Sequence, residues 1–253
     1  MYRQRRDSNW LINFKQNTRA DLRLFCFPYA GGTAAIFRSW ADSLPPNIDM
    51  WAVELPGRAT RRLEPASARI GDLVPPIASA LRSAIDRPFA VFGHSMGAIL
   101  GFEAVRALQE EYGLEAAHLF VSGHRGPHLP RKEPSIYHLP EDQFLEELRN
   151  LSGTPKEILD DPEMMQILLP YLRMDFEAAE TYKLLPGGRL VCPVSAYGGL
   201  SDEPIGPAEL DAWREHTSGP FSRRMFPGNH FYIQSAERLL ITTIARELLV
   251  SRR

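Results

Sequence analysis

The chain has 253 residues, of which 44% are hydrophobic, and this is enough to bury one sizeable core. Its formal net charge of −2, with 24% charged residues, gives no basic surface of the kind that binds nucleic acid. No apolar run approaches the ~20 residues that a membrane span needs, so neither nucleic acid nor a membrane is an expected partner.

Short apolar runs and helical spacing alternate along the chain. Apolar runs closed by glycine, proline or a turn predict strands at residues 22–27, 48–55, 88–92, 118–122, 190–197 and 223–226. Apolar residues three and four apart predict helices at residues 34–44, 70–85, 96–111, 207–216 and 233–250. This alternation favours an α/β fold, with a mostly parallel sheet covered by helices on both faces.

The segment between the fourth and fifth predicted strands does not continue this alternation of strand and helix patterns. At roughly sixty residues it is too long for an ordinary connection between a strand and a helix. It contains helical patterns at residues 142–151 and 163–182, interrupted by Gly153-Thr154-Pro155 and by Pro162. We therefore expect a core made of residues 1–125 and 187–253, with an insertion at residues 126–186.

The cysteines give no sign of a disulfide or a metal site. Cys26 and Cys192 lie inside apolar runs, without a CxxC partner or a histidine cluster, and are expected to be buried reduced thiols. The arginines near the N-terminus precede an apolar run, residues 10–12, that is far too short for a signal-peptide core. A cytoplasmic protein is therefore expected.

Gly93-His94-Ser95-Met96-Gly97 fits the pattern G-x-S-x-G and falls between a predicted strand and a predicted helix. Glycines at these positions permit the sharp turn that projects a nucleophilic serine, and the N–H of the following residue then faces the developing oxyanion. We expect Ser95 to be the nucleophile and Met96 to supply that N–H. The alternative is a tight glycine turn with an inert serine.

A serine nucleophile needs a general base, and in this type of site the acid and then the histidine follow the serine along the chain. The histidines that come too early for that order are His94, His118, His124, His128 and His138. Of the remaining two, His216 is expected on the solvated side of a helix. His230 follows the last predicted strand, at the kind of position where ligand chemistry gathers in α/β sheets, and is the preferred base.

The orienting acid is expected to be Asp202, which ends the glycine-rich loop that leaves the strand at residues 190–197. Glu203 is an adjacent rival, Asp211 is expected to face solvent one helix later, and Asp175 lies in the insertion. A second oxyanion donor should come from the loop after an early strand, and Phe27-Pro28-Tyr29-Ala30-Gly31-Gly32 is such a loop.

With these residues in place, the chain resembles the type II thioesterases, the stand-alone editing enzymes of polyketide and nonribosomal peptide synthesis. The resemblance spans nearly the whole chain. Its motifs are Phe27-Pro-Tyr-Ala-Gly-Gly32, Phe37 with Trp40, Leu55-Pro-Gly-Arg58, Gly93-His-Ser-Met-Gly-Ala98, Ser122-Gly-His-Arg125, Gly153-Thr-Pro155, Leu172-Arg-Met-Asp175, Glu180-Thr-Tyr182 and Gly228-Asn-His-Phe231.

The resemblance implies an α/β-hydrolase fold in which Ala30 and Met96 donate the N–H groups of the oxyanion hole. It also implies that residues 126–186 form a helical lid, and that the substrate is a thioester on the phosphopantetheine arm of a carrier protein. No metal or organic cofactor is expected. His124 stands where the family commonly has arginine, and Asn229 where it commonly has a second glycine.

Two rival functions remain open at this point. One is a chain-terminating fatty acyl thioesterase or a general carboxylesterase on the same fold. The other is an inactive hydrolase fold used as a docking module, against which the complete set of Ser95, Asp202 and His230 argues.

An acidic carrier protein would need a local basic cluster, since the chain is nearly neutral overall. Arg125, Arg131 and Lys132 fall together where the insertion leaves the core and are the candidate docking residues. A solvated loop is the alternative interpretation of so short a charge run. We expect a monomer.

Overall fold

A computed structural model of the protein describes residues 9–151, 153 and 156–250. The strands of this part of the chain are β1 (Leu11–Ile12), β2 (Leu22–Phe27), β3 (Ile48–Val53), β4 (Phe89–His94), β5 (His118–Ser122), β6 (Val194–Gly199) and β7 (Phe221–Phe226). They form one sheet in the order β1-β3-β2-β4-β5-β6-β7. β1 runs antiparallel to β3, and the other neighbouring pairs are parallel.

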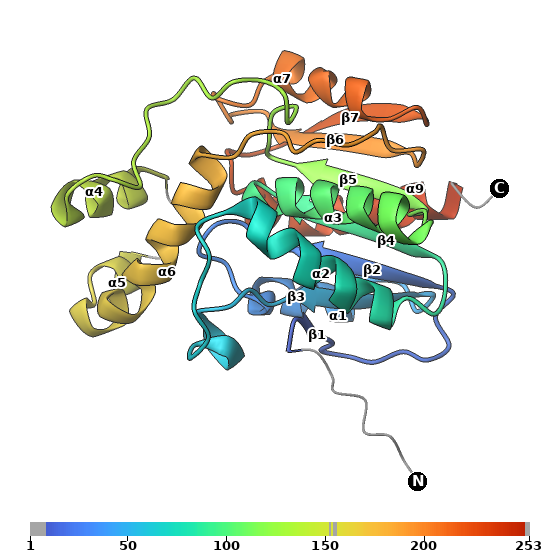
Figure 1. Ribbon diagram of the computed structural model, residues 1–253, viewed down its shortest axis with the longest axis horizontal. Helices are drawn as coiled ribbons and strands as arrows, with labels where there is room; N and C mark the ends of the chain where they lie inside the picture. Colours follow the sequence, from blue (N-terminus) through green and yellow to red (C-terminus); the bar gives the residue numbers. More distant parts are fainter. Residues whose placement is uncertain (1–8, 152, 154–155, 251–253) are drawn as a thin grey trace, which may run out of the picture.

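The α-helices are α1 (Arg38–Ser43), α2 (Ile70–Ala84), α3 (Met96–Tyr112), α4 (Glu141–Leu151), α5 (Lys156–Leu159), α6 (Pro162–Glu180), α7 (Pro207–Asp211), α8 (Tyr232–Ser235) and α9 (Glu237–Val250). Short 3-10 helices are η1 (Ala34–Phe37), η2 (Ala59–Arg61) and η3 (Ala212–His216). Figure 1 shows α2 and α3 in front of the sheet and α9 behind it.

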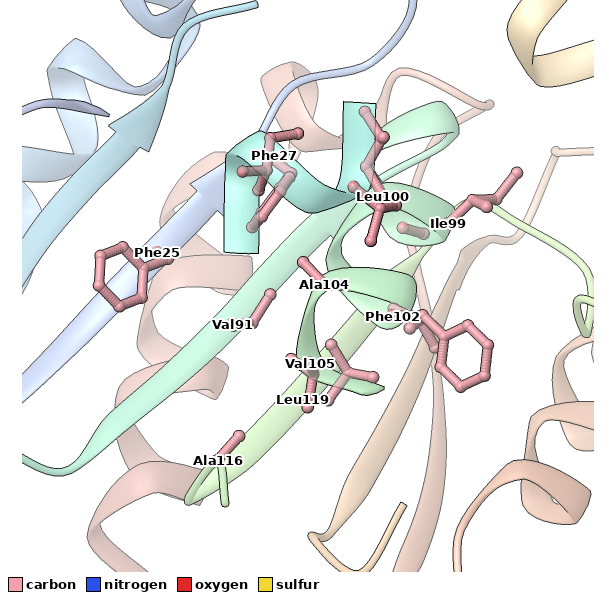
Figure 2. Packing of buried hydrophobic residues seen from close by; sticks show 14 of the residues in the cluster. Phe25, Phe27, Val91, Ile99, Leu100, Phe102, Ala104, Val105, Ala116 and Leu119 are labelled. Carbon is pink, nitrogen blue, oxygen red and sulfur yellow. The ribbon is translucent and has the colours of Figure 1, made fainter. Parts of the chain in front are cut away.

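The central strands bury both faces, as the continuous apolar runs in the sequence indicate. Along β4, Ala90 and Phe92 point into the cluster on the α9 side, while Phe89 and Val91 join the cluster on the α3 side. Figure 2 shows the second of these layers, where side chains of α3 pack against the strands. The predicted α/β architecture, with a mostly parallel sheet covered on both faces, is confirmed.

Several predicted elements have different bounds, and the helix expected at residues 207–216 is divided into α7 and η3. The helix expected at residues 34–44 is divided into η1 and α1 at Phe37, whose backbone leaves the helical region. β6 begins at Val194 instead of residue 190 because Pro193 has no N–H to donate to a neighbouring strand. The C-terminal helix is divided into α8 and α9 at Ala236. β1 was not predicted, since it has two residues only.

Helices α4, α5 and α6 share a separate hydrophobic cluster. Phe144 and Leu148 of α4 pack with Leu159 of α5 and Met165 and Leu169 of α6. In Figure 1 these helices lie to the left of the sheet. The helix α5 was not predicted, and Thr154 and Pro155 of the motif that precedes it lie outside the described residues.

Pro162 is not an interruption but the first residue of α6, where a missing N–H costs nothing. The carboxylate of Asp161 caps this end by accepting from the N–H groups of Glu163 and Met164, at 3.0 and 3.1 Å.

Cys26 and Cys192 are free and buried, as expected. Burial raises the pKa of the Cys192 thiol to about 12, which keeps it protonated and unreactive at neutral pH. Among the described residues, no helix has the length and apolar character required to span a membrane.

Candidate active site

The carboxyl ends of the parallel strands bring the chemically active loops to one edge of the sheet. The register places Phe27 beside Gly93, His94 beside Ser122, Ser122 beside Tyr197, and Gly199 beside Phe226. The loops that follow β2, β4, β6 and β7 therefore leave the sheet next to one another. These loops contain Ala30, Ser95, Asp202 and His230.

Ser95 stands on a strained turn between β4 and α3. Its φ of 55° and ψ of −120° are rare for a residue with a side chain, and they are typical of a serine projected from a nucleophile elbow. Both flanking glycines are required sterically. A Cβ on Gly97 would lie 2.3 Å from the carbonyl oxygen of Phe27, and one on Gly93 would lie 2.0 Å from that of Gly97.

His230 and Asp202 form a hydrogen-bonded pair. Nδ1 of the imidazole donates to Oδ2 of Asp202 at 2.8 Å, with the carboxylate side chain 1% exposed and the imidazole 26% exposed. This bond fixes the tautomer that leaves Nε2 free to accept a proton. The two loops are also joined through the backbone, since the N–H of Ser201 donates to the carbonyl oxygen of Gly228 at 2.9 Å.

Ser95 and His230 both lie beside the carboxyl end of β5. The N–H of Ser95 donates to the carbonyl oxygen of Ser122 at 2.7 Å. The next residue, Gly123, has a φ of +62°, and a Cβ there would lie 3.3 Å from Cε1 of His230. The dipeptide Ser122-Gly123 is thus bonded to the elbow and lies close to the His230 ring.

The rival acids lie elsewhere. Asp211 is exposed and pairs with Arg223 at 3.1 Å, as expected of a surface carboxylate. Glu203 is exposed in the loop beside Asp202. Asp175 is buried, and its carboxylate is paired with Arg58. Among the acids of the described residues, Asp202 is the one whose carboxylate is hydrogen-bonded to the His230 ring.

The expectation that His216 is a solvated histidine is wrong. It ends η3 and is half-buried, with its ring against those of Phe102 and Trp213. Its Nε2 lies 2.6 Å from Nδ1 of His128. The indole of Trp213 fills the core beside α3 and draws the end of η3 inward, which a helical pattern alone does not indicate.

Burial keeps several histidines neutral, and this gives a pH dependence of stability. It lowers the pKa of His118, His124 and His216 from the ordinary 6.5 to about 4, and it also holds the pKa of His94 well below the ordinary value. Between pH 6.5 and about 4 the unfolded chain then binds more protons than the folded chain. Their contribution to stability is complete above pH 6.5 and is lost as the pH falls towards 4.

We therefore expect the Tm to fall as the pH is lowered from 7 to 5, as thermal unfolding followed by circular dichroism can show. The buried carboxyl of Glu54, whose pKa burial raises to about 7, acts in the opposite direction and offsets part of the loss. His216→Gln should give a shallower dependence of Tm on pH. The exposed His138→Gln is the matched control, and equal slopes for the two variants would contradict the assignment.

The loop after β2 presents backbone N–H groups at the same edge. The N–H of Gly31 donates to Oδ2 of Asp175 at 2.7 Å, and that of Gly32 donates to the carbonyl oxygen of Tyr29 at 2.9 Å. Ala30 is half-buried, and its N–H has no partner among the residues that the structure describes. Met96 is the first residue of α3, where a helix leaves its N–H groups without internal partners.

A buried polar network behind His230 was not found from the sequence. Nδ1 of His94 lies 2.9 Å from Oγ of Ser122, which is also bonded to the hydroxyl of Tyr232. The rings of His94 and His230 are 5.1 Å apart between centroids. His94 therefore packs against the histidine of the pair and is fixed from behind by Ser122. Its position in the elbow motif was the only available signal.

The three candidate docking residues do not form an uncompensated basic patch. Arg131 and Lys132 are exposed, whereas Arg125 is buried and offers a partner little surface. Each is paired with a carboxylate of the same chain: Arg125 with Glu133, Arg131 with Glu180 at 3.1 Å, and Lys132 with Glu209 at 2.7 Å. Among the described residues, no group of three or more histidine, cysteine or acidic side chains is arranged to hold a metal ion.

Comparison with known proteins identifies the family. A family model described as a thioesterase domain matches residues 22–248. The chain is 42% identical to linear gramicidin dehydrogenase LgrE of Brevibacillus parabrevis, over 95% of this chain and 93% of that protein. It is 37% identical to thioesterase PikA5 of Streptomyces venezuelae, over 96% of this chain and 86% of that protein.

Among solved structures, the type II thioesterase BorB from the borrelidin biosynthetic cluster superposes with a TM-score of 0.87 at 37% identity, over 94% of this chain and 97% of BorB. The name of LgrE assigns a dehydrogenase activity to that protein, whereas the family model and the other two proteins are thioesterases. The chain therefore belongs to the thioesterase family, with the α/β-hydrolase fold and type II thioesterases among its relatives.

Proposed function

We propose that this thioesterase hydrolyses acyl thioesters with Ser95 as nucleophile, His230 as general base and Asp202 as the acid that orients the histidine. The observation that supports the proposal most is the 2.8 Å bond between His230 and Asp202, at the sheet edge where Ser95 stands on its strained turn. A serine, a histidine and a carboxylate in these roles form the triad of acyl-transfer enzymes.

The reaction has two halves. In the first, Nε2 of His230 takes the hydroxyl proton as Oγ of Ser95 attacks the acyl carbonyl carbon, and the resulting imidazolium then gives the proton to the departing thiolate. In the second, His230 takes a proton from water, which attacks the acyl-enzyme, and returns it to Oγ as the free acid leaves. The side chain of Asp202, bonded to Nδ1, stabilises the imidazolium in both halves.

The tetrahedral intermediates carry a negative charge on oxygen, and backbone N–H groups are suited to hold it. We propose those of Ala30 and Met96 for this role. The uncommitted N–H of Ala30 and the first turn of α3 support the assignment. Removing one such donor in other enzymes costs about 10²- to 10³-fold in turnover.

Residues 126–186 are proposed to act as a lid over Ser95. Their separate hydrophobic cluster and their position beside the carboxyl edge of the sheet support this (Figure 1). Gly153 lies against the ring of Phe231, the residue after His230, since a Cβ on Gly153 would lie 2.3 Å from that ring.

For the substrate, we propose acyl groups bound as thioesters to the phosphopantetheine arm of carrier proteins. The test is to load one acyl group on a carrier protein, on coenzyme A and on a simple ester, and to compare kcat/KM. We expect the highest value with the carrier thioester and release of the free acid. A simple ester hydrolysed as fast would favour a carboxylesterase, and equal rates with coenzyme A and carrier would remove the carrier from the proposal.

If a carrier protein docks at the exposed residues Arg131 and Lys132, its binding should depend on the salt concentration. Charges within a Debye length of about 8 to 10 Å steer association, so raising the salt concentration should raise KM for the carrier thioester and leave a small neutral thioester unchanged. Lys132→Ser should raise KM for the carrier substrate about threefold, a small effect because Glu209 already balances the charge.

Lys15→Ser is the matched control. Lys15 is also exposed and also pairs with one carboxylate, that of Asp42 at 3.0 Å, but it lies near β1. If Lys15→Ser and Lys132→Ser change KM equally, or if neither does, docking at this segment is wrong.

A further inference from the structure

The loop that contains Ala30 is joined to helix α6 by one buried carboxylate. Asp175 is 1% exposed, and its Oδ2 accepts the N–H of Gly31 at 2.7 Å. Gly31 has a φ of 78°, and a Cβ on it would lie 2.3 Å from Cδ2 of Leu172. Leu172 and Asp175 are three residues apart and therefore share one face of α6. That face lies directly on the loop.

Arg58 holds this carboxylate from the other side. Its Nη1 and Nη2 lie 2.5 and 2.7 Å from the two oxygens of Asp175, and both side chains are almost fully buried. Nη1 also donates to the carbonyl oxygen of Gly32 at 3.2 Å, and the guanidinium lies over the ring of Tyr171 at 4.6 Å. The two-point geometry fixes the direction of the carboxylate as well as its position.

These bonds determine which N–H groups of the loop remain for a ligand. Those of Gly31 and Gly32 are taken by Asp175 and by the carbonyl oxygen of Tyr29, while Ala30 has no partner in the described part of the chain. The bond to Gly31 also sets the orientation of the peptide next to Ala30. Without Asp175 the left-handed turn at Gly31 would lose the contact that holds it.

We propose that Asp175 and Arg58 are positioning residues for the oxyanion hole, through which the seating of α6 sets the orientation of the Ala30 N–H. This rests on the proposed function, because it takes Ala30 as an oxyanion donor. The alternative is a buried ion pair with a structural role alone, for which removal lowers stability but leaves turnover per folded molecule unchanged.

The experiment compares Asp175→Asn with Asp49→Asn, both assayed on a small neutral thioester below their unfolding temperatures. Asp49 is the matched control, because it is a buried carboxylate paired with Arg23 at 3.1 Å on β2 and β3. We expect Asp175→Asn to lower kcat about 10- to 100-fold, with KM changed less than about threefold, since the oxyanion forms only in the transition state. Asp49→Asn should keep kcat within about twofold, as expected of a distant site.

A trifluoromethyl ketone analogue of the substrate provides a second readout, because its enzyme-bound hemiketal places an oxyanion in the same hole. Its inhibition constant should rise by the same factor as kcat falls. An unchanged kcat in folded Asp175→Asn overturns the inference, as does an equal loss in Asp49→Asn. If Asp175→Asn does not fold, Arg58→Lys replaces it, with a fall in kcat again expected and an unchanged kcat overturning the inference.

Ser95→Ala in the same assay separates this inference from the proposed function. If Ser95→Ala abolishes turnover while Asp175→Asn keeps the kcat of the parent, the function stands and only the positioning role is wrong. If Ser95→Ala remains active, the proposed nucleophile is wrong and the loop has no oxyanion to hold.

Discussion

Ser95→Ala is expected to lower kcat for thioester hydrolysis by at least about 10⁴-fold while leaving the fold unchanged. Without the hydroxyl, no acyl-enzyme forms, and the remaining site supplies only positioning and oxyanion stabilisation. The structure is expected to tolerate the change, because the elbow is held by the backbone bond from Ser95 to Ser122. Alanine meets the same left-handed strain as serine at this φ.

The measurement is turnover of an acyl thioester by purified protein, with the Tm recorded in parallel. Ser83→Ala, on the exposed side of α2, is the control and should match the parent. A residual rate for Ser95→Ala within tenfold of the parent would show that another group attacks the substrate.

The central strands of the sheet could be predicted from the sequence because they are buried on both faces. A strand of this kind appears as a continuous apolar run, and the residues of β2 and β4 have no exposed position to interrupt it. Because these strands are parallel, the loops that follow them leave the sheet at the same edge, and this places Ser95, Asp202 and His230 there. Neither inference needs a long-range contact.

The contacts that depend on side-chain packing between distant segments could not be predicted. Arg58 and Asp175 are 117 residues apart, and the sequence contains many other arginines and aspartates that fit a pair equally well. The sequence therefore presents Asp175 as a rival to Asp202 and as part of a family motif, but it does not indicate Arg58 as its partner. In the same way, the half-buried position of His216 follows from the packing of Trp213 against Phe102, which helical spacing does not determine.

The surface charge around the candidate docking residues could not be predicted from the sequence either. A run of basic residues indicates positive potential only if no acids fold against it, and Glu133, Glu180 and Glu209 do so here. Two of these acids come from helices that follow the basic segment by tens of residues. The sign of the charge on a local surface therefore depends on which residues the fold brings together, and a basic run in the sequence does not determine it.

The second large effect is expected at the proposed general base, where His230→Ala should lower kcat by at least about 10³-fold. The imidazole must accept the proton of Ser95 and return it to the leaving thiol, and no other histidine is bonded to Asp202 among the described residues. His94 is the nearest ring, but it is fully buried, its Nδ1 is engaged by Ser122, and burial lowers its pKa well below the ordinary value.

His216→Ala is the matched histidine variant and should keep kcat within about twofold, although it removes ring contacts and is expected to lower the Tm. The kcat of Asp202→Asn should lie between those of His216→Ala and His230→Ala. The amide can no longer hold the imidazole in the required tautomer or stabilise its charged form. Measuring kcat for the three variants on one thioester, at a temperature where all are folded, tests the assignment as a set.

Because His230 and Asp202 act through one hydrogen bond, the double variant should be hardly slower than His230→Ala alone. Additive losses would mean that Asp202 acts on something other than His230, and a larger loss at His216 than at His230 would assign the base to the wrong histidine.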